Sequence, residues 1–128
     1  MDQSDALEAL AALAHETRLS AFRLLVTAGP EGLPASVIAE RLGVLPNTLS
    51  THLGLLSRAG LATGKREGRV IRYAADFGGM RALMSFLLRD CCAGRPELCA
   101  PLVAIAESCS VVSERMEGAE GDHNGPAL

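Results

Sequence analysis

The pattern of apolar and polar positions in the first 60 residues predicts four helices. Apolar side chains recur every three or four positions, as they do along one face of a helix, and three of the four runs end at a glycine. The expected helices cover residues 4–14, 16–28, 34–42 and 46–58. Ser4 stands where the first helix would take its N-cap residue.

The third and fourth expected helices are short and are joined only by Gly43-Val44-Leu45, which is the layout of a helix-turn-helix. The period then changes, because residues 61–75 form two β-type runs around Glu67-Gly68. A hairpin with its turn near that pair is therefore expected. A hairpin directly after a helix-turn-helix is the wing of a winged helix.

Two further helices are expected after the hairpin, over about 77–92 and 97–116. The predicted fold class is mainly α with a small β-hairpin, a winged helix-turn-helix. We expect one such domain over residues 1–117, with a DNA-reading part at 34–75. The Gly-rich, polar tail at 118–128 has almost no apolar anchors and is expected to be disordered.

Composition narrows the function classes. The apolar fraction of 48% fits a chain that buries a core. No apolar run approaches the roughly 18 residues of a membrane span, and the acidic N-terminus lacks the order of a signal peptide. A cytoplasmic protein without a membrane partner is expected. With only four aromatic residues, a base-stacking surface for RNA or single strands is not favoured.

The formal net charge of −3 looks unfavourable for nucleic acid, but it is unevenly distributed. Residues 41–72 hold six basic residues and one acidic residue, a formal charge of +5, while the rest of the chain sums to −8. Duplex DNA binding draws on local cationic patches through counterion release. The acidic total therefore does not exclude DNA as a partner.

The fourth helix and the hairpin tip carry side chains suited to DNA. Short polar groups near the start of a recognition helix fit base edges and phosphates, and cations at a hairpin tip reach phosphates or a minor groove. The expected DNA-binding residues are Asn47, Thr48, Ser50, Thr51, His52, Lys65, Arg66 and Arg69. The plainer alternatives are an exposed polar face, a solvated turn and, for His52, helix packing. Arg72 is expected beside the strand face.

Over about residues 7–90 the sequence resembles the ArsR/SmtB family of metal-sensing winged-helix repressors. The resemblance rests on E-T-R-L at 16–19, T-L-S-T-H-L at 48–53, and A-G-L at 59–61 leading to R-E-G-R at 66–69. It implies a homodimer, built by the first and last helices, that represses transcription from double-stranded operator DNA until an ion or small inducer binds. The family's DNA contacts fall on the residues named above.

Two positions depart from the family pattern. Leu45 stands where the family often has a Ser or Thr N-cap, and the lost cap costs about 1 kcal/mol. Gly54 stands where members commonly carry Lys or Arg, and a glycine inside a helix costs about another 1 kcal/mol. DNA affinity is therefore expected to depend more on the wing.

Three of the four cysteines, Cys91, Cys92 and Cys99, fall within nine residues of one another. Gly94 permits a chain reversal that can bring three sulfurs to one point. Soft thiolates select thiophilic ions, and three sulfurs without histidine suit arsenic(III) or antimony(III), because zinc normally takes a fourth ligand. Some arsenic-responsive family members look similar here. We expect these three residues, in a sensing segment at 90–99, to be the metal ligands.

Two other ion sites of the family are not supported, because residues 33–42 hold no cysteine and residues 76–92 hold no histidine. The expected function is an arsenic(III)-responsive repressor, released from its operator when the ion binds, with no organic cofactor. The alternatives are a disulfide switch on the same cysteines, a different soft metal ion that recruits Cys109, and cysteines that are only small apolar residues. An enzyme is not favoured, because there is no Gly-rich nucleotide loop and no C-x-x-C.

Overall fold

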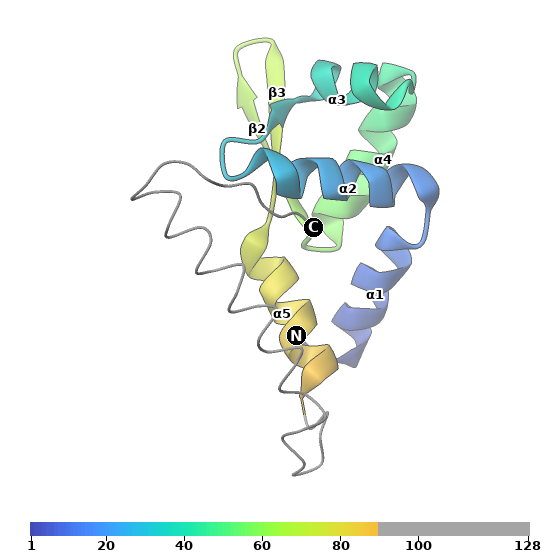
Figure 1. The fold of residues 1–128 in the computed structure, drawn as a ribbon, viewed down its shortest axis with the longest axis vertical. Coiled ribbons are helices and arrows are strands. Elements are labelled where there is room, and N and C mark those ends of the chain that lie inside the picture. The colour runs from blue at the N-terminus through green and yellow to red at the C-terminus, as the bar shows by residue number, and fades with distance from the viewer. Residues whose placement is uncertain (90–128) are drawn as a thin grey trace, which may run out of the picture. The chain divides into compact units, whose positions relative to one another are not determined.

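The computed structural model describes residues 1–89, and it has the winged helix-turn-helix fold that the sequence predicts. Within these residues, five helices and a small antiparallel sheet follow one another (Figure 1). Their order is α1 (Gln3–Leu13), α2 (Glu16–Ala28), β1 (Leu33–Pro34), α3 (Ala35–Leu42), α4 (Pro46–Arg58), β2 (Ala62–Glu67), β3 (Val70–Ala75) and α5 (Phe77–Leu88).

The start of α1 differs from the expectation of a Ser4 cap. Asp2 is the N-cap residue, and its carboxylate accepts the Asp5 N–H at 2.8 Å. The Asp5 carboxylate accepts the Asp2 N–H in return at 3.2 Å. This reciprocal capping box satisfies two backbone donors at once, so the helix begins earlier and Ser4 lies inside its first turn.

Helices α3 and α4 form the helix-turn-helix. Gly43 ends α3 in the left-handed conformation, with φ of 66°. The Val44 N–H then bonds to the Ala39 carbonyl and closes the turn. Pro34 is the N-cap of α3 rather than part of its first turn, whereas Pro46 occupies the first turn of α4 as expected. A glycine suits the turn because it adopts a positive φ without steric cost.

The wing is the hairpin of β2 and β3. Glu67 pairs with Val70, so the turn is Gly68-Arg69, one residue later than the sequence suggests. A third strand, β1, pairs with β3 and places Leu33 opposite Tyr73, in the sheet order β1-β3-β2. Gly32 precedes this strand with φ of +68°, and a Cβ there would lie 2.0 Å from the Tyr73 carbonyl oxygen. Only glycine fits so close an approach.

The core consists of aliphatic side chains, alanines and Phe22, contributed by every described helix and by the sheet. The largest fully buried side chains are Leu25, Ile38, Leu49, Leu53, Leu56 and Leu61. From α1 the buried residues are alanines, including Ala6 and Ala9, whereas Leu7 and Leu10 remain exposed. The apolar stripe of α1 therefore supplies small residues to the core and leaves larger ones on the surface.

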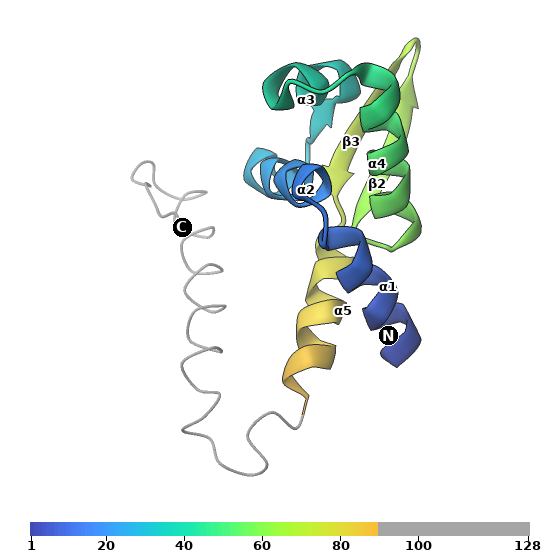
Figure 2. The same cartoon turned by 90° about the vertical axis from the view of Figure 1, so that its right-hand side faces the viewer.

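The two ends of the unit Met1–Leu87 have different elements (Figures 1 and 2). The α3–α4 turn and the hairpin tip lie at one end, which we call the reading end. Helices α1 and α5 lie at the other end. None of the helices in residues 1–89 has the length and apolar character that crossing a membrane requires. The segment at 90–99, the helix expected at 97–116, the domain boundary at 117 and the tail lie outside the described residues.

Candidate nucleic-acid interface

Helix α4 divides into a buried face and an exposed polar face. Leu49, Leu53 and Leu56 pack into the core. The polar residues expected to contact DNA, apart from His52, are exposed: Asn47, Thr48, Ser50 and Thr51. The Thr51 hydroxyl donates to the Asn47 carbonyl at 3.4 Å.

Helical spacing defines the surface farthest from the core, which we call the outer α4 face: Asn47, Thr51, Gly54 and Arg58. Arg58 is exposed, and sequence reasoning counted its charge without assigning it to DNA. A Cβ at Gly54 would meet nothing within 4 Å. The larger side chain that the family pattern has at this position would therefore fit without a clash.

His52 lies differently from its neighbours on α4. Its side chain is half-buried and turned toward the start of α2, where its ring centroid is 4.5 Å from that of His15. Its Nδ1 is 3.1 Å from Nη1 of Arg18. Because a guanidinium can only donate, the neutral His52 ring accepts at Nδ1. This position favours the helix-packing interpretation of His52.

Arg18 is the centre of this contact and was not singled out by sequence reasoning. Its Nε donates to the Ala12 carbonyl at 2.6 Å, and its Nη1 faces His52. Arg18 therefore joins the end of α1, the first turn of α2 and the middle of α4. The available signal was an arginine in the E-T-R-L motif, one turn before the buried Phe22.

Burial lowers the pKa of His52, and the electrostatic effects of the neighbouring His15 and Arg18 lower it further. The neutral ring is thus the form that the fold favours. His15 is itself the N-cap of α2, because its Nδ1 accepts the Thr17 N–H at 3.1 Å.

The wing carries three exposed cations near its tip, Lys65, Arg66 and Arg69. Glu67, the one acidic residue of the hairpin sequence, is bonded to Arg72 through a 3.3 Å contact between Nε and Oε1. Arg72 also donates to the Glu31 carbonyl at 3.5 Å. Arg72 lies beside the strands, as expected, directly opposite Lys65. It links Glu67, next to the turn, to the loop before β1, while Lys65, Arg66 and Arg69 remain exposed.

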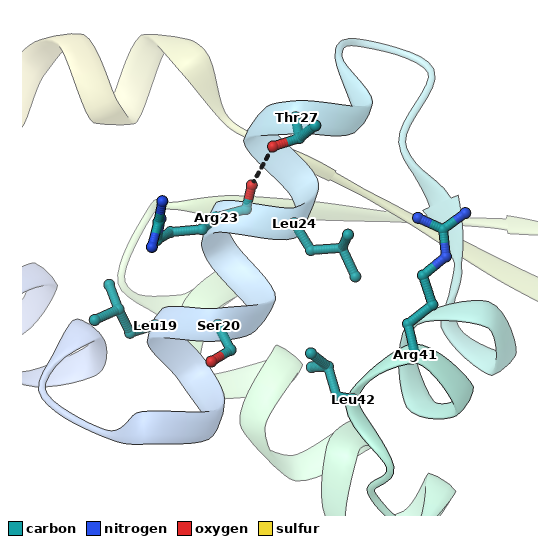
Figure 3. Close-up of a pocket in the computed structure, with 7 residues that line it drawn as sticks. All are labelled: Leu19, Ser20, Arg23, Leu24, Thr27, Arg41 and Leu42. Carbon is teal, nitrogen blue, oxygen red and sulfur yellow. Dashed lines mark hydrogen bonds between the residues drawn. The ribbon is translucent and has the colours of Figure 1, made fainter. Parts of the chain in front are cut away.

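A shallow depression of about 460 Å³ lies between α2 and α3 (Figure 3). Its lining residues are Leu19, Ser20, Arg23, Leu24, Thr27, Arg41 and Leu42. The Thr27 hydroxyl donates to the Arg23 carbonyl at 3.0 Å. The lining combines aliphatic side chains with two arginines and holds no carboxylate.

The expected ligands Cys91, Cys92 and Cys99 lie outside the described residues. Within residues 1–89, no group of three or more His, Cys, Asp or Glu side chains is placed to hold a metal ion. Asp76 caps α5, because its Oδ1 accepts the Gly79 N–H at 3.0 Å. Its carboxylate is thus used by the fold.

Residues 13–64 match the model of a helix-turn-helix domain family. HlyU from Vibrio cholerae is 27% identical, with a TM-score of 0.56, over 70% of this chain and 96% of its own. A possible transcriptional regulator for arsenical resistance is 29% identical, with a TM-score of 0.55, over 73% of this chain and 95% of its own. Among curated proteins, none matches the chain.

A third structure is described as the homodimeric winged helix-turn-helix DNA-binding domain of a possible ArsR-family transcriptional regulator from Mycobacterium bovis. It is 22% identical, with a TM-score of 0.56, over 94% of this chain and 89% of its own. At this identity the likeness concerns the fold alone.

The fold and the matched domain define a winged-helix protein with a helix-turn-helix. The expected resemblance to ArsR-type regulators is confirmed. The chain is therefore similar to transcriptional regulators of the ArsR/HlyU type.

Proposed function

We propose that the chain is an arsenic(III)-responsive repressor that binds operator DNA as a homodimer and leaves it when a trivalent arsenical or antimonite binds Cys91, Cys92 and Cys99. The observation that carries the proposal is the grouping of these three thiols just after α5 in the sequence. The described part of the same chain has a winged helix-turn-helix fold. Three thiols without histidine favour a soft trivalent ion.

The reading role is supported by the arrangement of charge and polarity. The outer α4 face and the tip cations Lys65, Arg66 and Arg69 belong to elements that meet at the reading end (Figures 1 and 2). A recognition helix contacts base edges through its N-terminal residues, and the wing contacts the backbone. In this proposal Asn47, Thr48, Ser50 and Thr51 read the major groove.

The homodimer is supported by apolar side chains at the other end of the unit. Leu7 and Leu10 on α1, and Met84 and Leu87 on α5, are exposed. Apolar surface of this kind is stabilised when a second copy covers it. The Mycobacterium bovis neighbour is described as homodimeric, and a dimer would present two reading helices one DNA turn apart.

The switch follows from thiol chemistry. Arsenous acid, As(OH)₃, and three thiols give three As–S bonds and release three water molecules, with no change in oxidation state. Closing the segment at 90–99 around one atom restrains the chain directly after α5. The neighbour described as a possible regulator for arsenical resistance favours this choice of ion. Allosteric coupling of this kind is typically about 1–3 kcal/mol.

Fluorescence anisotropy with a labelled operator duplex tests the proposal. Arsenite is expected to weaken DNA binding of the wild-type chain by about fivefold or more. The variants Cys91→Ser, Cys92→Ser and Cys99→Ser are expected to bind DNA normally and to lose the response. Cys109→Ser is the matched control and keeps it. Unchanged release in the three variants would refute the assigned ligands.

The same titration separates the alternatives. A methylated trivalent arsenical needs only two thiols. If it still releases the Cys99→Ser variant from DNA, the third thiol is needed for inorganic arsenite alone. A disulfide switch predicts release by peroxide without arsenite, together with a loss of two free thiols per chain on thiol titration.

A further inference from the structure

Leu45 has the largest exposed fraction among the large apolar side chains of residues 1–89, at 74%. It is the residue directly before α4, and its carbonyl accepts the Leu49 N–H at 2.9 Å, the first hydrogen bond of that helix. Its backbone is extended, with φ of −62° and ψ of 141°. The position of Leu45 is therefore fixed by α4, although its side chain packs into no core.

A leucine at this position is unfavourable for the fold in two ways. Its side chain cannot accept a hydrogen bond, and α4 has no side-chain cap, whereas a serine would accept from the Thr48 N–H. It also leaves apolar surface in water, without contributing to packing. A leucine at this position therefore does not stabilise the fold of residues 1–89. A contact between this side chain and a binding partner would explain it.

The location of Leu45 identifies that partner. The α3–α4 turn lies at the reading end, opposite α1 and α5 (Figures 1 and 2). The proposed dimer surface on α1 and α5 therefore does not cover Leu45. Leu45 stands two residues before Asn47 and three before Thr48, the polar residues expected at base edges. The N-terminal end of a recognition helix is the part that reaches into the major groove.

We propose that Leu45 is a specificity-determining residue that packs against the 5-methyl group of a thymine in the operator. Thymine is the base that presents an apolar group in the major groove, and an aliphatic side chain recognises it by contact. This inference rests on the proposed DNA binding. It adds an apolar contact to a reading surface whose other expected members are polar.

The experiment uses duplexes that differ only in that methyl group. A binding site is first selected from a random duplex pool with the full-length wild-type chain. Each thymine of one half-site is then replaced in turn by deoxyuridine, which keeps every hydrogen-bonding group and removes the methyl. Affinities are measured by anisotropy for the wild-type chain, Leu45→Ala and Leu45→Ser.

At one position the replacement is expected to weaken wild-type binding about fourfold, the effect of one lost buried methyl group. Leu45→Ala and Leu45→Ser should bind thymine and uracil duplexes equally well. Leu45→Ser should also unfold at higher urea concentration than the wild type, because it gains a cap. Lower affinity together with higher stability is a result that a merely structural role does not give.

The control is Leu19→Ala, which removes an exposed leucine from α2. It should keep the full sensitivity to uracil. If the wild-type chain binds every uracil duplex as tightly as the thymine duplex, or if Leu45→Ala retains the fourfold effect, the inference is wrong while the proposed DNA binding stands. If no duplex is selected from the pool, the proposed function itself fails, and the inference fails with it.

Discussion

His52 lies where several groups that carry or can gain positive charge meet. Arg18 donates to its Nδ1, and the His15 ring lies against it with centroids 4.5 Å apart. A proton on His52 Nδ1 would remove the acceptor for Arg18 and add a like charge between the two neighbours. The packing of α4 against α2 is thus coupled to the protonation of His52.

The sign of this coupling follows from the lowered pKa of His52, which desolvation and then His15 and Arg18 produce. The unfolded chain binds a proton on this ring at higher pH than the native chain does. The free energy of unfolding therefore falls as the pH drops below the ordinary value of 6.5, and this loss is complete once the native ring is also protonated.

Urea denaturation on both sides of about pH 6.5 measures this effect. We expect the wild-type chain to lose stability on the acid side, and His52→Gln to lose less, because glutamine does not titrate and its amide oxygen can still accept from Arg18. The other titrating groups are the same in both chains, so the difference isolates His52. Equal losses in the two chains would show that His52 does not titrate in this way.

At the scale of elements, the wing combines a bonded pair with exposed cations. Arg72 joins Glu67, next to the turn, to the loop before β1. Lys65, Arg66 and Arg69 are exposed at the tip. Support and charge are therefore carried by different residues of one hairpin.

If the tip cations contact phosphates, their removal should change the salt dependence of binding rather than the base preference. We expect Lys65→Ala, Arg66→Ala or Arg69→Ala to lower the slope of log K against log salt by about 1 each, with affinity reduced evenly across sequences. Arg81→Ala is the control, because it removes the same charge from exposed α5. A salt titration with an unchanged slope in the wing variants would contradict the assignment.

Local patterns predicted most of the elements. Helix α2 has the expected bounds, and α4 begins at the expected proline, because helix periodicity and stop residues are local signals. Strand β1 was missed, because a two-residue strand exists only through its pairing with Tyr73 across the chain. The hairpin turn was placed one residue early, because Glu67-Gly68 and Gly68-Arg69 both offer the glycine that such a turn uses.

In the candidate site, too, local features could be predicted and long-range contacts could not. The exposure of Asn47 and Thr51 follows from the spacing of Leu49 and Leu53, so the sequence predicted it. The inward turn of His52 depends on Arg18, 34 positions earlier in the chain, and no local pattern encodes such a contact. The expected cysteine ligands stay a prediction.

At the scale of the whole molecule, the two ends of the unit Met1–Leu87 differ in surface character. The start of α4 and the hairpin tip lie at the reading end (Figure 1), and both expose polar or cationic side chains. The other end exposes apolar side chains of α1 and α5, among them Met84 at 50% and Leu87 at 47% exposure. In the proposed homodimer each unit would read one half-site, so the affinity for the operator would depend on the α1 and α5 end as well.

A charge placed on the α5 surface should therefore weaken DNA binding from a distance. We expect Met84→Glu with Leu87→Glu to leave the unit folded, since both side chains are already about half exposed, and to shift the chain from dimer to monomer. Without the second reading helix, operator affinity should fall roughly 100-fold, the scale on which linked sites reinforce each other. Ser85→Glu adds one such charge about 100° further round the helix from Met84 and should change neither property. Sedimentation velocity measures the oligomeric state, and anisotropy on the same samples measures the operator affinity. The prediction fails if the double variant remains dimeric, or if the monomer binds the full operator as tightly as the wild-type chain.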